Sequence, residues 1–430
     1  MDASTCPKPA RSAKEGKPLN VLSLFSGCGG MDLGFEGGFV VHAGSVNESL
    51  SPDFVEKSAG KDRVLLRQTA FRIVFANDIL KEARVAWTHH FAKLGYPPAI
   101  YRTDSVVDLV KRQKTGENVF PPDIDVVTGG FPCQDFSLSG NRRGFQSRKD
   151  HQGKPIQGEL PSEETRGKLY YWMKEVIDIT RPKIFIAENV KGLVNLGDVK
   201  DIIQRDFSSA DGGGYIVLSP QVLHAANYGV PQSRERVIFI GIRKDLLKRE
   251  ALEALTQENI PEAYNPYPHP THAFSVHGER LAPPQTLRNV FAHLREPDES
   301  GDPSQQFYSK AKFMGKHCQG QIEVCLDSIG PTIRSEHHGN IEYRRLSAEH
   351  GGKENKELRK GLPERRLTPR ECGLIQTFPT DYEFVFKEGD GKRYALSASG
   401  AYKVIGNAVP PLLAYHIARR IESLWNLYFE

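Results

Sequence analysis

A cysteine at the edge of an apolar run is the first residue of this sequence that suggests covalent chemistry. Cys133 stands in GGFPCQDF, directly after the apolar run at 124–127. A thiolate is both a nucleophile and a good leaving group, so a cysteine at a strand end could act in covalent catalysis. Nearby cations or a helix N-terminus would have to lower its pKa, which is about 8.5 in a free thiol. An inert cysteine in a turn is the alternative.

A glutamate and two arginines stand beside further apolar runs. Glu188 in AENV directly follows the run at 183–187. A carboxyl group partly buried at a strand end has a raised pKa and can work as an acid near neutral pH. Arg234 and Arg236 in QSRER open the run at 236–242 and, being two residues apart, face the same way in an extended chain. We therefore expect both to reach one anionic or carbonyl group, and a solvated ion pair is the alternative.

A glycine-rich turn follows the first apolar run, at 21–25. It reads LFSGCGGMDLGF, and glycines 27, 29 and 30 permit a tight turn and the close approach of a ligand to the backbone. The GxGG spacing differs from the dinucleotide GxGxxG, and no GK[ST] follows it, so phosphate binding is not favoured. A plain loop without a ligand is the alternative.

Three acidic residues could complete a ligand site at this turn. An adenosine-type ligand needs a carboxylate at the end of the second strand to hold the ribose hydroxyls. Asp78 in FANDI fits that place, although its distance from the glycine turn requires residues 37–70 to be an insertion. Glu48 has the better spacing but no convincing strand before it, and we prefer Asp78. Asp104 in YRTDS could end the next strand, and a capping or surface carboxylate is the alternative for each acid.

The order of apolar runs predicts the elements that position these residues. Short apolar runs that end in glycine or polar clusters alternate with helical patterns at 79–95 and 167–180, which indicates a doubly wound, mostly parallel α/β sheet. A glycine-punctuated turn and then an amphipathic helix are expected over 397–425, whereas residues 244–361 are rich in Pro, His, Gly and charge and predict a second, irregular domain. The expected strands are 21–25, 72–76, 124–127, 183–187, 215–223 and 236–242.

The composition excludes several classes of protein. The chain has 430 residues, a net charge of +4 and six cysteines without a CxxC pair or a Cys/His metal spacing. A disulfide framework or a metal site is therefore not expected, and a reducing cytoplasm is the natural setting. No apolar stretch of about eighteen residues predicts a membrane span. Residues 1–19 have basic residues without an apolar core, as in a flexible tail.

Together the motifs resemble those of the DNA cytosine-5 methyltransferases of restriction-modification systems, over about residues 20–243 and 366–415. FSGCGGMDLGF, GGFPCQDFS, ENV, QSRERVIFI, RLTPRECGLIQTFP and YKVIGNAVPPLLA are similar to six family blocks in the family's order. The resemblance implies a class I, Rossmann-like methyltransferase domain over 20–243 plus 395–430. It also implies a target-recognition domain over 244–394 that contacts the major groove of DNA.

The resemblance also implies a role for each matching residue. Cys133 would attack C6 of a flipped-out cytosine, which cannot be reached within the base stack. Glu188 would hold the base at N3 and the exocyclic amine, and Arg236, with Arg234 as a second candidate, would contact the base carbonyl. S-adenosylmethionine would donate the methyl group to C5 and leave as S-adenosylhomocysteine. The residues implied for its site are Phe25, Ser26, Cys28, Gly29, Gly30, Asp78 (ribose), Ile79, Asp104 (adenine amine), Ser105, Pro132, Leu169, Asn407, Ala408 and Val409. Those implied for DNA are Gln134, Ser137, Ser139, Thr332 and Arg334.

Other functions would leave different marks in the sequence. Cys28 is expected to be a small packing residue rather than a second nucleophile. A tRNA cytosine-5 methyltransferase of the same family would have a compact recognition region and a Cys-Phe-Thr tripeptide, which this sequence lacks. A silent relative would lack the cysteine or the glutamate, and an amino-methyltransferase would need an Asn/Asp-Pro-Pro-aromatic motif. We expect a monomer that binds double-stranded DNA, with which a separate cognate restriction endonuclease would be compatible.

Overall fold

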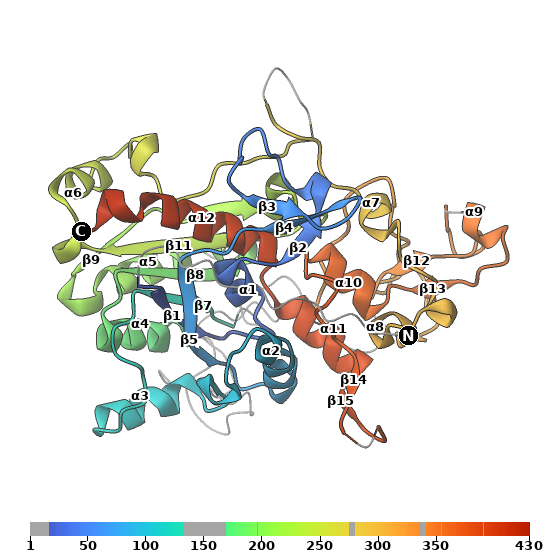
Figure 1. Cartoon of the computed structure of the whole chain (residues 1–430), viewed down its shortest axis with the longest axis horizontal. Helices are drawn as coiled ribbons and strands as arrows, with labels where there is room; N and C mark the ends of the chain where they lie inside the picture. Colours follow the sequence, from blue (N-terminus) through green and yellow to red (C-terminus); the bar gives the residue numbers. More distant parts are fainter. Residues whose placement is uncertain are drawn as a thin grey trace.

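A single large sheet lies in the left half of the molecule as drawn in Figure 1. The computed structural model describes residues 17–132, 169–195, 197–274, 280–335, 341–353, 355–389 and 391–430. Within them the sheet has eight strands in the order β6-β5-β1-β7-β8-β11-β10, with β9 beside β11. The strands are β1 (Leu19–Leu24), β5 (Phe71–Asn77), β6 (Tyr101–Arg102), β7 (Val126–Gly130), β8 (Ile184–Val190), β9 (Tyr215–Val217), β10 (Gln221–His224) and β11 (Glu235–Arg243).

The order of the strands brings the predicted motifs to one edge. The strands from β6 to β8 are parallel, and β11 runs antiparallel to β8, β9 and β10. From β1 the chain goes to β5 and β6 on one side and later to β7 and β8 on the other. The topological switch point, where open α/β sheets bind ligands, therefore lies beside the carboxyl end of β1. The predicted doubly wound, mostly parallel fold is confirmed.

Side chains of the strands pack into two apolar layers, one on each face of the sheet. Val21 and Ile73 pack with helices on one face, and Leu22 and Phe75 pack with helices on the other. Both faces are covered, which explains why the central strands are almost continuously apolar. The first face carries α1 (Gly30–Glu36), α2 (Lys81–Lys93) and α12 (Pro411–Tyr428), and the second carries α3 (Val106–Lys114), α4 (Leu169–Thr180) and α5 (Val199–Ser208).

Residues 37–70, expected as an insertion, contain a small antiparallel sheet in the order β2-β4-β3. Phe54 packs edge-on against Tyr415 of α12, with 5.0 Å between the ring centroids. On the other side, Nδ2 of Asn47 donates to the carbonyl oxygen of Thr271 at 2.9 Å. The insertion thus links the central domain to the region after β11. Its strands are β2 (Val40–His42), β3 (Val55–Ser58) and β4 (Arg63–Leu66).

Buried ion pairs hold together the irregular region after β11. Arg365 pairs with Glu371 at 2.9 Å and with Glu296 at 3.0 Å, and Arg345 pairs with Glu296 and Glu357. Both arginine side chains are buried, and a buried cation has to be paired with an anion. The elements are α6 (Arg249–Leu255), α7 (Leu287–Phe291), α8 (Pro303–Gln306), β12 (Tyr343–Arg345), α9 (Asn355–Leu358), β13 (Arg365–Arg366), α10 (Pro369–Ile375), β14 (Phe386–Lys387), β15 (Tyr394–Leu396) and α11 (Ala398–Asn407).

The exact domain limits stay a prediction, although one contact bears on them. Helix α6 lies within the predicted second domain by sequence, yet it packs on α12 of the central domain, and the N–H of Lys248 donates to the carbonyl oxygen of Tyr428 at 2.8 Å. None of the helices in the described residues is both long and apolar enough to cross a membrane.

Two predicted elements differ from the structure. The strand expected at 215–223 is divided into β9 and β10, because Pro220 has no N–H to continue the ladder. The expected glycine-punctuated turn is wrong, because residues 398–407 form the helix α11, capped by the side chain of Ser397. Gly406 is required there for close packing: a Cβ on it would lie 2.1 Å from the backbone carbon of Arg334.

Candidate active site

The glycine turn lies at the carboxyl end of β1, and its glycines have different tasks. Gly27 has φ of +55°, and a Cβ on it would meet nothing within 4 Å, so this part of the turn is open to a ligand. Gly29 has φ of +80°, and a Cβ there would lie 2.7 Å from the ring of Trp87. A Cβ on Gly30 would lie 2.2 Å from the carbonyl oxygen of Val409. Gly29 therefore allows α2 to approach the turn, and Gly30 allows the segment between α11 and α12 to approach it. A contact of these two glycines with a ligand stays a prediction.

The end of β5 brings Asp78 against this turn. One carboxylate oxygen accepts the N–H of Gly27 at 3.1 Å, and the other accepts the N–H of Leu80 at 2.9 Å. Burial raises the pKa of Asp78 to about 6, although these two hydrogen bonds favour the ionised form. Glu48 is exposed within the insertion. Of the two acids considered for the ribose, only Asp78 contacts the glycine turn.

Asp104 and Ser105 follow β6 at the same edge of the sheet. The backbone oxygen of Asp104 accepts Nδ2 of Asn77 at 2.8 Å, while its exposed carboxylate pairs with Arg112 at 3.0 Å. The side chain of Ser105 caps α3 and is buried. Ile79 is exposed beside Asp78. The structure thus gathers Ile79, Asp104 and Ser105 near the glycine turn, and their predicted part in a cofactor site stays a prediction.

The contacts of Cys28 are those of a buried packing residue. Its thiol is fully buried and lies 3.3 Å from the carbonyl oxygen of Val404, and burial raises its pKa well above the ordinary value. The backbone oxygen of Cys28 accepts the hydroxyl of Tyr382 at 2.6 Å. A thiol in this state is a poor nucleophile. Ser26 is also buried, and its hydroxyl donates within the turn to the backbone oxygen of Ser23 at 3.0 Å.

The described residues next to the predicted nucleophile end at Pro132. Cys133, Gln134, Ser137 and Ser139 lie outside the described residues. The backbone oxygen of Phe131 accepts Nδ2 of Asn189 at 3.2 Å, which fixes the end of β7 beside β8. Leu169, also predicted for the cofactor site, is buried at the start of α4.

Glu188 lies opposite the end of β7. It is the register partner of Gly130, and a Cβ on Gly130 would lie 2.9 Å from Oε2 of Glu188. Nε of Arg236 donates to Oε1 of Glu188 at 2.7 Å, and both side chains are buried. Burial raises the pKa of Glu188, while the Arg236 and Arg234 cations oppose this rise. The site therefore holds a carboxyl group that keeps its proton to a higher pH than an exposed glutamate.

Arg234 contacts other groups than Arg236, contrary to the expectation that both would reach one group. Its guanidinium donates to the carbonyl oxygens of Ile333 (3.0 Å), Gly406 (3.0 Å) and Ala408 (2.8 Å). Arg234 precedes β11, and its buried side chain joins two distant segments rather than pairing with Glu188. One segment contains Thr332 and Arg334, and the other Asn407, Ala408 and Val409.

These two segments meet beside the glycine turn. The hydroxyl of Thr332 donates to the backbone oxygen of Ser233, and Arg334 pairs with Glu342 at 2.7 Å. Asn407 is exposed at the end of α11, whereas Ala408 and Val409 are buried. The structure thus places the predicted DNA residues Thr332 and Arg334 next to the end of the predicted cofactor segment.

Two buried glutamines in this junction were missed from the sequence. Nε2 of Gln232 donates to Oε1 of Gln376 at 2.9 Å, and Nε2 of Gln376 donates to the carbonyl oxygen of Ile405 at 2.8 Å. Oε1 of Gln232 accepts the N–H of Ile333 at 3.1 Å. Both stand within the quoted blocks QSRER and LIQTFP, so position in a motif was the available signal, but their partners are far away in sequence.

The chain is similar to known proteins along most of its length. The family model for C-5 cytosine-specific DNA methylase matches residues 57–423. The Type II methyltransferase M.BsuRI of Bacillus subtilis is 32% identical over 96% of this chain and 81% of the relative. The Type II methyltransferase M.BspRI of Lysinibacillus sphaericus is 31% identical over 94% of this chain and 82% of the relative.

Solved structures agree in fold. The structure of the S. pombe Dnmt2 methyltransferase has a TM-score of 0.54 and 17% identity, and the match covers 95% of this chain and 99% of that chain. Since the family model spans most of the chain and the Type II relatives match over nearly its whole length, the chain belongs to the C-5 cytosine-specific DNA methylases, as a cytosine-C5 DNA methyltransferase of the restriction-modification type.

Proposed function

We propose that this enzyme methylates C5 of a cytosine in a specific double-stranded DNA sequence through a covalent bond between Cys133 and C6 of the base. The observation that supports this most is the buried pair of Glu188 and Arg236, which faces the end of β7 at Gly130. Cys133 follows β7 by three residues. A carboxyl group, a guanidinium and a thiol would thereby share one pocket.

In this mechanism the thiolate of Cys133 attacks C6 and the C5–C6 double bond opens. Its electrons form a C4–C5 double bond while N3 takes a proton from Glu188, which leaves an enamine that is nucleophilic at C5. C5 then takes the methyl group, and the electrons of the broken C–S bond stay on the sulfur of the methyl donor. A water molecule removes the C5 proton, the C5–C6 double bond re-forms, the thiolate leaves and the N3 proton returns to Glu188. Glu188 donates its proton to a hydrogen bond at N3 and accepts one from the exocyclic amine, and Arg236 stabilises the charge at the base carbonyl. The base must leave the duplex to reach these groups.

The residues at the switch point fit the adenosine part of S-adenosylmethionine, which the family implies as the methyl donor. Gly27 leaves open space, and Asp78 carries two oxygens that can accept ribose hydroxyls beside it. When bound, S-adenosylmethionine supplies an electrophilic methyl group on sulfur. We propose that the turn, Asp78, Asp104 and the segment 407–409 bind it, since they surround the carboxyl end of β1 as ligands in this fold require.

We propose that the region after β11 reads the target sequence and that Gln134, Ser137, Ser139, Thr332 and Arg334 contact DNA near the flipped base. The position of Thr332 and Arg334 against the junction of Arg234 and α11 supports this, because that junction borders the cofactor segment. The monomeric state, the cytoplasmic location and a separate cognate endonuclease remain predictions from sequence.

The covalent mechanism is tested with the Cys133→Ala variant. Transfer of labelled methyl groups from S-adenosylmethionine to duplex DNA should fall to background, and the variant should unfold at the same urea concentration as the wild type. A duplex carrying 5-fluorocytosine at the target should form an adduct with the wild type that survives denaturation, because fluorine cannot leave as a proton does. Persistent transfer by Cys133→Ala would refute the mechanism.

The alternative, a tRNA cytosine-5 methyltransferase, is separated by the same assay with transfer RNA in place of the duplex. The Type II relatives and the family model favour DNA. We expect labelled methyl groups in DNA and background levels in tRNA, and the reverse result would establish the alternative.

A further inference from the structure

A basic and apolar segment follows α8 in the region after β11. Residues 307–322 read FYSKAKFMGKHCQGQI and contain no acidic residue. From 310 to 316 the exposure alternates: Lys310, Lys312, Met314 and Lys316 are exposed, and the residues between them are half-buried. This period of two is that of an extended chain with one face on the protein and the other in solvent.

A buried arginine holds the inner side of the segment. Arg366 of β13 donates to the carbonyl oxygens of Ala311 at 3.3 Å, Lys312 at 3.4 Å and Gly320, and it lies 3.9 Å from the centre of the Tyr343 ring. The hydroxyl of Tyr343 also donates to the carbonyl oxygen of Ala311, at 3.2 Å. The segment therefore has a defined shape although it belongs to no helix or strand.

Two large apolar side chains of the segment, one in its middle and one at its C-terminal end, are exposed. Met314 is 65% exposed and Ile322 is 69% exposed. Their positions are linked, because the N–H of Met314 donates to Oε1 of Gln321 at 2.8 Å and the carbonyl oxygen of Ile322 accepts the N–H of Tyr343 at 2.9 Å. These hydrogen bonds bring the backbone of Met314 next to Gln321, the neighbour of Ile322, and lysines stand on both sides of Met314 in the sequence.

We propose that this segment, residues 307–322, is a DNA-contacting surface of the recognition region. Lys310, Lys312 and Lys316 bind phosphates of one strand, and Met314 and Ile322 contact base edges in the groove. A row of cations on an extended chain without acidic residues complements a linear polyanion, and apolar contacts with base edges carry sequence information that phosphate contacts do not. The proposal rests on the proposed function, in which duplex DNA is the substrate.

The lysines are tested by the salt dependence of binding. The K310Q/K312Q/K316Q variant should bind a duplex with the methylated sequence and a duplex without it more weakly by a similar factor, at least about tenfold at about 50 mM salt. The slope of log K against log salt should become shallower by about 2.7, which is about 0.9 for each of three phosphates. An unchanged slope would overturn the phosphate assignment.

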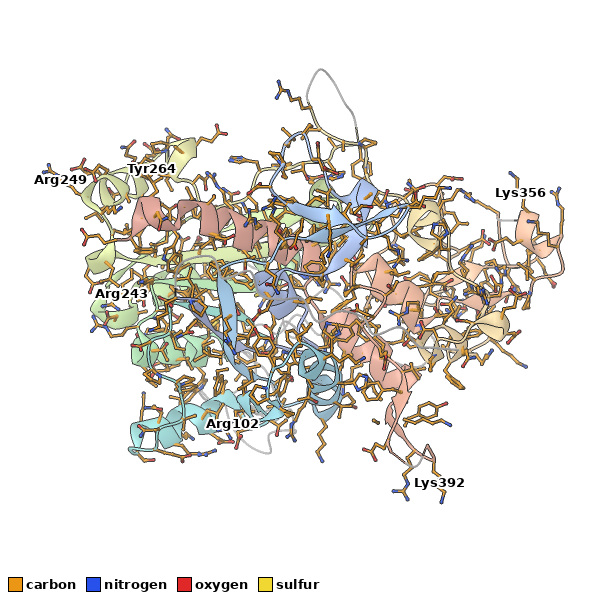
Figure 2. All side chains as sticks on the ribbon, in the orientation of Figure 1. Arg102, Arg243, Arg249, Tyr264, Lys356 and Lys392 are labelled. Carbon is orange, nitrogen blue, oxygen red and sulfur yellow. The ribbon has the colours of Figure 1, made fainter. Side chains whose placement is uncertain are left out.

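The matched control removes three cations at the other end of the molecule. Lys244, Lys248 and Arg249 lie around α6, which follows β11 but packs on α12 of the central domain rather than on the recognition region. Figure 2 labels Arg249 at the end opposite Lys356 of α9. The K244Q/K248Q/R249Q variant has the same net charge as K310Q/K312Q/K316Q and should keep the wild-type slope of log K against log salt. An equal change in both variants would show an effect of net charge alone and would overturn the proposal.

The apolar pair is tested by the preference for the target sequence, which bisulfite sequencing of DNA from a host expressing the wild type first identifies. The M314A/I322A variant should lose about 5- to 150-fold in affinity for the target duplex while its affinity for the other duplex and its salt slope stay unchanged. The control L246A/L427A removes two exposed apolar side chains elsewhere and should keep the preference. A wild-type preference in M314A/I322A would overturn the base contacts.

Wild-type methyl transfer, measured in parallel, separates the two levels of failure. If the wild type transfers no methyl groups to DNA, the proposed function fails and this inference fails with it. If the wild type methylates DNA while K310Q/K312Q/K316Q and M314A/I322A bind DNA as the wild type does, only the inference about this segment is wrong.

Discussion

Arg234 and Arg236 stand two residues apart, but we expect replacement of Arg234 to lower mainly stability and replacement of Arg236 to lower mainly activity. The Arg234→Met variant loses three hydrogen bonds of 2.8 to 3.0 Å to backbone carbonyls of two segments. Hydrogen bonds to a charged donor contribute about 1.5–3 kcal/mol each, but removal of the buried cation also removes its desolvation cost. We therefore expect a loss of about 3–5 kcal/mol in the free energy of unfolding, near the lower end of the sum for three such hydrogen bonds.

The Arg236→Met variant should mainly lose activity. Replacement of Arg236 leaves Glu188 buried without the closest cation. Because the carboxyl group of Glu188 can then bind a proton, the free energy of unfolding should fall by less than about 2 kcal/mol. Loss of a group that stabilises the transition state should lower methyl transfer by about 10²–10³-fold.

The two variants are compared by urea unfolding and by methyl transfer at a temperature where both are folded. Arg234→Lys and Arg236→Lys serve as conservative controls, since each keeps the charge but not the planar fork. A result in which Arg234→Met unfolds like the wild type and yet loses transfer would refute the reasoning, because Arg234 would then contact the substrate.

Three further predictions concern the glycine turn. Below about pH 6 the carboxyl group of Asp78 gains a proton and loses acceptor capacity. The affinity of the wild type for S-adenosylmethionine, measured by calorimetry, should therefore fall from pH 7 to pH 5, whereas the affinity of Asp78→Asn should be weaker but independent of pH. The same pH dependence in both proteins would count against Asp78. Gly30→Ala places a Cβ 2.2 Å from the backbone of Val409 and should lower the urea midpoint by the equivalent of about 1–3 kcal/mol together with cofactor affinity, and a wild-type midpoint would contradict the close contact. Cys28→Ala should keep methyl transfer within about threefold, since its buried thiol lacks nucleophilic character, and alkylation of the native protein should leave Cys28 unmodified in a peptide map; modification of Cys28 before unfolding would show that it is accessible.

Much of the central sheet could be predicted because its signal is local. The runs at 21–25, 72–76, 124–127 and 183–187 became β1, β5, β7 and β8, shifted by up to three residues at their ends. Their apolar character follows from burial on both faces, which any short window of sequence records. The placement of Asp78 beside the turn also follows, since carboxyl ends of parallel strands share an edge.

The parts that could not be predicted depend on distant partners. The glycines that follow residue 397 predict a turn, but Gly406 lies in a helix and allows it to touch the backbone of Arg334, which is 72 residues earlier in the sequence (406 − 334). The two-residue alternation of an extended chain predicts that Arg234 and Arg236 face the same way. The side chain of Arg234 instead donates hydrogen bonds to carbonyl groups of two remote segments. Such contacts leave no mark within a short window, and a tertiary partner outweighs the local pattern.

The walls of the glycine turn come from the far end of the chain, and this affects the timing of synthesis. Gly34 of α1 packs on α12 so closely that a Cβ there would lie 2.4 Å from Cβ of Ala414, and Tyr382 bonds to Cys28 across 354 residues. At about 5–20 residues per second, that stretch takes roughly 20–70 s to synthesise. Throughout this interval the first strand and its turn have left the ribosome without the surfaces that shape them. A nascent or prematurely terminated chain therefore lacks the walls of the turn, and we expect that only a molecule that has completed α12 can begin to act on DNA.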